Sequence, residues 1–426
     1  MATAKDWTVM VYMAGDNNLD SAGVVDLKEM KKTGSTDRIN IIVQFDRAGA
    51  GAATNRYYVQ KGGTIAKDAV AGLGETNMGD PAVLEDFVAW GIKRYPAAHY
   101  LLVLWNHGAG WDDANLYEGD VFSGAAPPVS RKKQLLATGR SATRNLKPLQ
   151  FTLARAGLSR TRRALFRTSV ERAVRNRAIA FDDQAQDFLD NVELKRVMMK
   201  IKRKLRKPID ILGMDACLMS MMEVAYQMRA AANYSVGSEE TEPGEGWPYD
   251  LILKSMAADP GMSPQDVAKL IVSKYLASYK HGDNVTQSAV RLANLKTLVD
   301  AISKLGRCLS SALPNPSKRS AIMTARAQVQ EYSRPYDDYC DLLDLCDLLK
   351  DGVADTQVQT ACSDVRTAAS DAVVVSGYKG GAVDKSHGLS IYFPKRSLSP
   401  LYRTLDFTKA STWDEFLKAY IASLGR

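Results

Sequence analysis

Two short apolar runs, each ending in a polar loop, constrain the fold of this 426-residue chain more than any other feature. The first run is YLLVLW at residues 100–105, and His107 lies in the loop that follows it. The second is IDILGM at residues 209–214, and Cys217 lies in its loop. Runs of this length and composition are typical of strands buried in a parallel sheet. Because the carboxyl ends of such strands meet at one edge of the sheet, both loops are expected to share a ligand-binding crevice.

A thiol and an imidazole at the same sheet edge are a nucleophile and its base. A free thiol is only a few per cent thiolate near neutral pH, so Cys217 needs a base such as His107. Gly108 is small enough for its backbone to approach a substrate, and its N–H with that of Cys217 is expected to form an oxyanion hole. Considered alone, His107 is best interpreted as a histidine in a turn and Cys217 as a small residue of the core. The pair at two strand ends favours catalysis.

Four motifs, in order along the chain, resemble the clostripain family of cysteine peptidases. They are WTVMVYMAGDN at 7–17, NHGAGW at 106–111, DACLM through Glu223 at 215–223, and SEE through PGEGWPY at 238–249. A further stretch, GLSIYFP at 388–394, extends the resemblance, which lapses between about residues 113 and 178. The resemblance implies a caspase-like α/β/α sandwich with a mostly parallel central sheet. It also implies a Cys/His dyad and cleavage after Arg or Lys.

Carboxylates near Cys217 suggest a site for a substrate cation. Asp215 lies two residues before Cys217, so on an extended backbone it points to the same side as the thiol. There it can receive the side chain of a substrate Arg or Lys, as the resemblance also implies; the alternative is that Asp215 caps a following helix. The loop after the next predicted strand adds acids that either deepen this site or form a solvated charge run. These acids are Glu239, Glu240, Glu242 and Glu245.

Calcium is the cofactor that the resemblance implies, and no organic cofactor is expected. Asp16 and Asn17 end the first predicted strand, where they either contact a substrate or metal or form a turn. Four further residues resemble a family stretch and offer the hard oxygen ligands that calcium needs, without an EF-hand pattern. They are Asp182, Asp183, Asp187 and Asp190. The metal ligands therefore stay unassigned. His387 precedes a strand, but no cysteine follows at a comparable strand end, so we interpret it as a core or edge histidine.

Charge and cysteine content exclude several classes of protein. Residues 131–177 carry 14 Lys or Arg against one acid, Glu171, so the net charge of +8 becomes −5 outside this segment. The five cysteines lack CxxC spacing, which argues against a disulfide framework and a structural zinc site.

No secretory signal is evident and no apolar run reaches about 18 residues, so no membrane span is expected. The default expectation is a cytoplasmic protein; a secreted one whose signal was removed is the alternative.

The basic segment at 131–177 has two interpretations. Its glycines and proline and its weak apolar stripe favour a mobile loop. A peptidase that selects Arg or Lys would carry its own substrate there, and family precursors are similar in being cut between the His and Cys strands. We therefore expect a zymogen whose fragments stay associated after self-cleavage. The rival is a nucleic-acid-binding segment, although only Phe151 and Phe166 supply aromatic rings. An inactive caspase-fold binding module is the third alternative, and the intact His107 and Cys217 argue against it.

The periodicity of apolar residues predicts a catalytic core over 1–255, with the insertion at about 113–178. A mainly helical portion over 256–426 is expected to return at least one strand to the sheet. Besides the two apolar runs, the expected strands cover 8–14, 39–46, 234–238, 373–376 and 388–394. The expected helices cover 81–94, 192–205, 218–232, 264–279, 295–313, 317–332 and 339–350.

Overall fold

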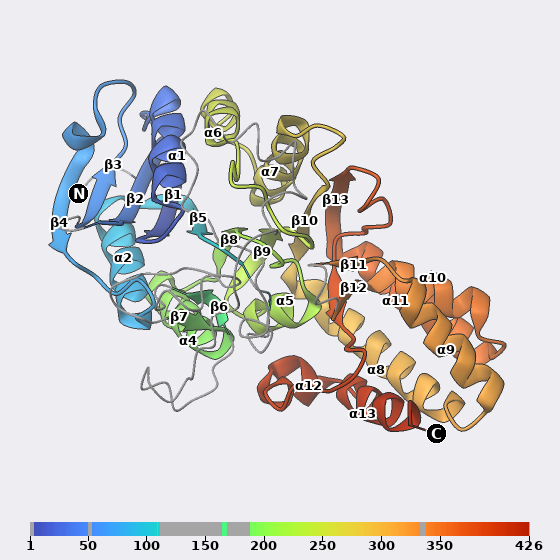
Figure 1. Cartoon of the computed structure of the whole chain (residues 1–426). Helices are drawn as coiled ribbons and strands as arrows, with labels where there is room; N and C mark the ends of the chain where they lie inside the picture. The colour runs from blue at the N-terminus through green and yellow to red at the C-terminus, as the bar shows by residue number, and fades with distance from the viewer. Residues whose placement is uncertain are drawn as a thin grey trace.

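A nine-stranded sheet forms the centre of the protein. The computed structural model describes residues 4–49, 53–108, 110, 164–167, 188–332 and 338–425. The strand order is β13-β10-β9-β8-β5-β1-β2-β3-β4 (Figure 1). The strands are β1 (Lys5–Gly15), β2 (Ile39–Arg47), β3 (Thr54–Tyr58), β4 (Ala69–Gly74), β5 (Ala97–Trp105), β8 (Ile209–Asp215), β9 (Ala232–Gly237), β10 (Val285–Arg291) and β13 (Val373–Lys379).

The five central strands of this sheet are parallel. β2, β1, β5, β8 and β9 pair in parallel, whereas β3, β4, β10 and β13 join antiparallel at the two edges. Every residue of β8 is buried, as expected for a strand covered on both faces. The mostly parallel sheet confirms the expected α/β architecture, and it brings the carboxyl ends of β1, β5 and β8 to one edge.

Helices cover both faces of the sheet (Figure 1). On one face Met10, Leu102 and Leu212 belong to a core that includes residues of α2, α4 and α5. On the other face, Val103 and Ile211 belong to a second core with α1, α6 and α7. Adjacent strand residues thus point to opposite layers. The helices are α1 (Asp20–Thr33), α2 (Pro81–Arg94), α4 (Asn191–Leu205), α5 (Met222–Met228), α6 (Tyr249–Ala258) and α7 (Pro264–Ser278).

The portion after residue 256 is mainly helical and returns β10 and β13 to the sheet. It also forms a small sheet of β11 (Glu331–Tyr332), β12 (Tyr339–Asp341) and β14 (Ser390–Tyr392). The division at residue 255 stays a prediction. The helices of this portion are α8 (Leu295–Ala312), α9 (Pro316–Gln328), α10 (Leu342–Gly352), α11 (Thr356–Ala372), α12 (Asp406–Ala410) and α13 (Trp413–Ser423). In the described part of the chain, no helix combines the length and apolarity that crossing a membrane requires.

Little of the predicted basic insertion falls within the described residues. Of the 131–177 segment the structure describes only β6 (Ala164–Arg167), which pairs antiparallel with β7 (Phe188–Asp190). The remainder of that segment lies outside the described residues, as do three of the four aspartates considered as calcium ligands. Those three are Asp182, Asp183 and Asp187.

The predicted boundaries of three helices were wrong, and the first of these helices also ends early, at Met228, before β9 begins at Ala232. The helix expected from residue 218 begins only at Met222, because Leu218 has a φ of 62° and Met221 instead pairs with Ser390. The helix expected over 317–332 ends at Gln328, and the chain continues into β11. The helix expected from residue 339 begins at Leu342, after β12, with Asp341 as its cap. In the first and third cases a contact with the distant β14 region replaces local helical periodicity, and in the second case β11 pairs with the nearby β12.

Candidate active site

The pairing of β5 with β8 brings the His107 and Cys217 loops together. Trp105 lies opposite Asp215 in the parallel register, so both candidate residues lie two positions beyond the same pair. The Asn106 N–H donates to the Asp215 carbonyl at 3.2 Å and extends the ladder by one step. Beyond it, Gly108 packs on the backbone of Cys217: a Cβ at residue 108 would lie 1.7 Å from the Cys217 carbonyl oxygen. Only glycine permits this approach.

Side-chain amides fix the histidine loop against the first strand. The Nδ2 of Asn106 donates to the carbonyl of Ala14 in β1, and its Oδ1 accepts the His107 N–H at 2.5 Å. The imidazole Nε2 lies 2.7 Å from Oδ1 of Asn18, in the turn after β1. The sequence does not distinguish Asn18 except by its position after Asp16 and Asn17. Its functional contact is with His107, which is 89 residues away in the chain, so no local pattern reveals it.

The thiol is held by backbone groups. Sγ of Cys217 accepts the Glu242 N–H at 3.2 Å and lies 3.8 Å from the Glu242 carbonyl oxygen, and the Gly108 N–H also donates to it. Cys217 and His107 are both half-buried. The protein around them nevertheless excludes enough water to shift the pKa of each side chain. Burial raises the pKa of Cys217 to about 12 and lowers the pKa of His107 to about 4. Near pH 7 the pair is therefore neutral thiol and neutral imidazole.

The Asp215 carboxylate is buried beside the thiol loop. Its Oδ2 accepts the hydroxyl of Tyr249 at 2.8 Å and the N–H of Trp247 at 3.4 Å. Asp215 does not cap a helix, since α5 begins at Met222. Glu242 lies next to Asp215. The pKa of Glu242 is raised mainly by burial and also by the charge of Asp215. These two adjacent carboxyls, Asp215 buried and Glu242 half-buried, disfavour double ionisation and form a site complementary to a cation.

The other acids of the 239–245 loop lie in different surroundings. Glu239 is buried, accepts the Gly388 N–H at 2.8 Å, and has its pKa raised by burial and by the neighbouring Asp341. Glu240 accepts the N–H of Thr241 at 2.7 Å, and Glu245 is half-buried. Of this loop, Glu242 is therefore the acid that the structure brings to Asp215. Sequence spacing could not separate it from its neighbours.

His387 lies apart from the thiol, in the small-sheet region. Its Nδ1 is 2.9 Å from Oδ1 of Asp341, and its N–H donates to Oδ2 of the same carboxylate at 2.6 Å. The hydrogen bond to Asp341 raises the pKa of His387. These contacts agree with its interpretation as an edge histidine.

A group of carboxylates lies at the carboxyl ends of β1 and β2. Oxygens of Asp16, Asp46 and Glu75 lie within 4.8 Å of one another, and the first two residues are buried. Within the described residues, these three acids form the group close enough to hold a metal ion. Asn17 is instead engaged in the turn, where it donates to Ala14 and accepts from Leu19. The fourth candidate aspartate, Asp190, caps α4 through the N–H groups of residues 192 and 193.

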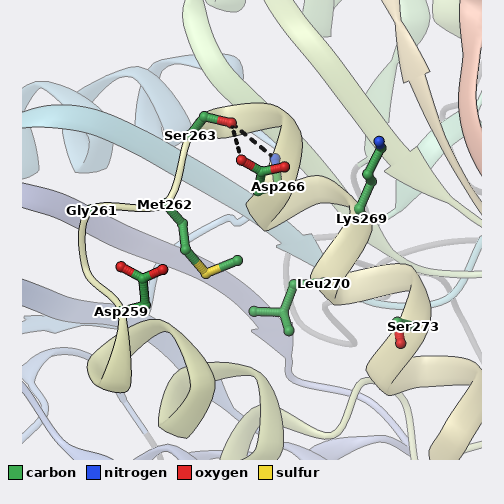
Figure 2. A pocket seen from close by; sticks show the side chains of 8 residues that line it. All are labelled: Asp259, Gly261, Met262, Ser263, Asp266, Lys269, Leu270 and Ser273. Atoms are coloured by element: carbon green, nitrogen blue, oxygen red, sulfur yellow. Dashed lines mark hydrogen bonds between the residues drawn. The ribbon is translucent and has the colours of Figure 1, made fainter.

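A pocket on the surface lies away from this constellation (Figure 2). Met262, which lines it, accepts a hydrogen bond from Nε1 of Trp7 near the amino end of β1, so the pocket is at the opposite end of the sheet from Cys217. The hydroxyl of Ser263 caps α7 by accepting the Asp266 N–H and bonds its carboxylate at 2.6 Å, as Figure 2 shows. Two of the polar residues of this pocket, Ser263 and Asp266, therefore cap the start of α7.

The chain as a whole is similar to known proteins. The sequence profile of the clostripain family matches residues 11–121 and 167–420. Clostripain of Hathewaya histolytica is 26% identical over an alignment of 287 residues, and the match covers 61% of this chain and 44% of that protein. The chain thus matches less than half the length of this curated relative.

Two solved structures share the fold, each with a TM-score of 0.63 and each covering 96% of this chain. One is a secreted C11 cysteine protease from Bacteroides thetaiotaomicron in complex with an irreversible peptide inhibitor, with 20% identity over 100% of that chain. The other is an inactive zymogen C11 protease from Parabacteroides distasonis, with 19% identity over 99% of that chain.

Proposed function

Because the chain belongs to the clostripain family of cysteine peptidases, we propose that it is an endopeptidase that cuts after Arg or Lys, with Cys217 as nucleophile and His107 as base. The observation that carries this proposal is the contact between the two strand-end loops, which holds the backbone of Gly108 against Cys217. A pair of neighbouring carboxyls, buried Asp215 and half-buried Glu242, lies in the same region. Nucleophile, base, backbone donors and a cation-binding group are thus within one edge of the sheet.

In the proposed reaction, the thiol proton moves to the imidazole as sulfur attacks the substrate carbonyl. His107 then gives this proton to the leaving amine, and the resulting thioester is hydrolysed by water. The Gly108 and Cys217 N–H groups are the proposed oxyanion donors; loss of one such donor typically costs about 100- to 1000-fold in rate. Burial disfavours both the thiolate form of Cys217 and the imidazolium form of His107. The pKa values therefore favour proton transfer during the attack over a thiolate–imidazolium pair that forms before it.

The specificity proposal rests on Asp215 and Glu242. A guanidinium or ammonium group entering beside them would replace the proton that the two carboxyls share, so cation binding and ionisation are coupled. A carboxylate engaged by two parallel N–H groups favours Arg over Lys. Glu239, Glu240 and Glu245 were predicted to contribute as well, and their roles stay predictions. A peptide library scanned at the residue before the cut tests the proposal, and preferred cleavage after acidic or apolar residues would refute it.

The activation proposal is that the chain is made as a zymogen and cuts itself within 131–177. Three findings support it: the segment is rich in Arg and Lys, a solved structure of the same fold is an inactive zymogen, and the Glu242 backbone engages the thiol. A tethered loop is presented at about millimolar effective concentration, which saturates even a weak site. Residues 101–105 of β5 pair with residues 211–215 of β8, so the two fragments would stay joined through the sheet.

Self-cleavage has a direct readout by intact mass. New carboxyl termini at Arg or Lys within 131–177 are expected after incubation of the wild-type protein, while Cys217→Ala stays a single chain. A wild-type protein that remains full length and still hydrolyses Arg or Lys peptides at full rate would refute the zymogen proposal. Steeply salt-dependent binding of the uncut chain to DNA or RNA would support the nucleic-acid alternative instead.

Calcium is proposed as a cofactor, with Asp16, Asp46 and Glu75 as its ligands. The group fits calcium because all three offer hard carboxylate oxygens, and Thr54 Oγ1 already donates to one oxygen of Asp46 at 2.6 Å. A bound cation would offset the repulsion among the acids and thereby stabilise the turn after β1. Calcium should raise the melting temperature of the wild-type protein but not that of Asp46→Asn, and an equal response of both would exclude this site.

A further inference from the structure

The turn after β1 places an amide beside the catalytic histidine. Asn17 is nearly fully buried and fastens this turn: its Nδ2 donates to the Ala14 carbonyl at 3.0 Å and its Oδ1 accepts the Leu19 N–H at 2.7 Å. The Asn106 side chain donates to the same Ala14 carbonyl from the histidine loop. The turn and the histidine loop are therefore anchored at one backbone oxygen. Asn18, the next residue, is exposed and reaches His107.

From this geometry we propose that Asn18 is a positioning residue, which sets the orientation and the proton position of the His107 imidazole. The inference deepens the proposed peptidase function and rests on it. Oδ1 of Asn18 lies 2.7 Å from Nε2 of His107. An amide oxygen only accepts hydrogen bonds, so Nε2 must carry the proton of the neutral ring. Nδ1 then holds the lone pair and is the nitrogen that takes the thiol proton.

The neutral amide suits the buried surroundings of this histidine. A carboxylate in the place of Asn18 would favour the imidazolium and raise the pKa of His107, whereas burial lowers it to about 4. An amide orients the ring and selects its tautomer without adding a charge. Cysteine peptidases of the papain type use an asparagine in the same manner on an unrelated fold.

Two substitutions separate positioning from a structural role. Asn18→Ala removes the acceptor, so kcat for an Arg peptide should fall by about 100-fold, the lower end of general-base contributions, with KM little changed. Asn18→Asp restores an acceptor oxygen of the same reach, so it should recover most of kcat and move the acid limb of the pH profile upward. Asn294→Ala is the matched control: this half-buried asparagine precedes α8 and donates to the Asp371 carbonyl, so its substitution should leave kcat unchanged.

The proton position is measured directly by nitrogen-15 NMR of labelled histidine in Cys217→Ala protein, which cannot cut itself. The chain has only four histidines, and His107→Gln assigns the signal. Among the residues that the structure describes, the surrounding loops carry the titratable groups Asp16, Glu240 and Glu242, and these are the same in every variant. The inference predicts an Nε2–H tautomer for His107 that loses its preference in Asn18→Ala.

Each possible result supports or overturns the proposed role of Asn18. A lower kcat in Asn18→Ala at an unchanged melting temperature, with recovery in Asn18→Asp, supports the inference. Wild-type kcat in Asn18→Ala, or an Nδ1–H tautomer in the parent protein, overturns it. If the wild-type protein hydrolyses no peptide at all, the proposed function fails, and the tautomer measurement still tests the contact of Asn18 with His107.

Discussion

Gly108→Ala should inactivate the protein through geometry alone. The Cβ of alanine would lie 1.7 Å from the carbonyl oxygen of Cys217, 2.3 Å from its nitrogen and 2.5 Å from its carbonyl carbon. Real Cβ atoms essentially never approach within 3.0 Å of other atoms, so the two loops must separate by roughly 1.3 Å. All three neighbours are backbone atoms, which cannot move aside as a flexible side chain would. A misplacement of about 1 Å at a reacting centre typically costs about 100-fold in rate.

The assay for Gly108→Ala is kcat/KM on an Arg peptide, together with the rate of iodoacetamide alkylation at Cys217 and the melting temperature. Gly352→Ala is the control, because a Cβ there meets nothing within 4 Å. A loss of about 100-fold or more is expected for Gly108→Ala and none for Gly352→Ala. Wild-type kcat/KM and an unchanged melting temperature in Gly108→Ala would refute the close packing of the two loops.

Two further predictions concern buried carboxyls. Asp215→Asn should lower kcat/KM on Arg and Lys peptides by about 100-fold or more, since truncating a buried charge partner typically costs about 2–5 kcal/mol. Asp351→Asn, which alters an exposed acid near the end of α10, should change kcat/KM little, and equal losses in the two variants would contradict the specificity proposal. Glu223 is fully buried, and burial raises its pKa to about 7, above its ordinary value of 4.5. Its contribution to the free energy of unfolding is therefore complete below about pH 4.5, where it is neutral in both states, and is lost as the pH rises through 7. Glu223→Gln retains acceptors for Tyr402 and the Tyr392 N–H, so urea unfolding should show it about 3 kcal/mol more stable than the parent at pH 8 and equal at pH 4.5. A pH-independent difference would exclude this titration.

The sequence predicts well those elements whose patterns are local and continuous. β5 and β8 are nearly unbroken apolar runs, and α2 begins at Pro81 as expected for a proline in the first helical turn. These runs alone predict that His107 and Cys217 each follow the carboxyl end of a buried strand, and the structure shows that the two strands are neighbours. The register of β5 on β8 then places the two residues at matched positions.

The remainder depends on contacts between distant residues. The turn from Leu218 to Met221 replaces a predicted helical turn because Met221 pairs with Ser390, 169 residues later in the chain. Glu242 is one of four acids in its loop, and only the folded chain shows that it is the one beside Asp215. Asn18 approaches His107 only because β1 and β5 are neighbours. None of these contacts has a periodicity or spacing that a sequence pattern could reveal.

The most direct test of the central claim is hydrolysis of a fluorogenic peptide with Arg before the cut, measured for the wild-type protein and for Cys217→Ala at matched concentration. Melting temperature confirms that both proteins are folded. The account predicts turnover by the wild-type protein and none above background for Cys217→Ala, because the other four cysteines lie within α8, β12, α10 and α11 and not in the loop after β8. Turnover retained in a folded Cys217→Ala protein would contradict the assignment of Cys217 as nucleophile.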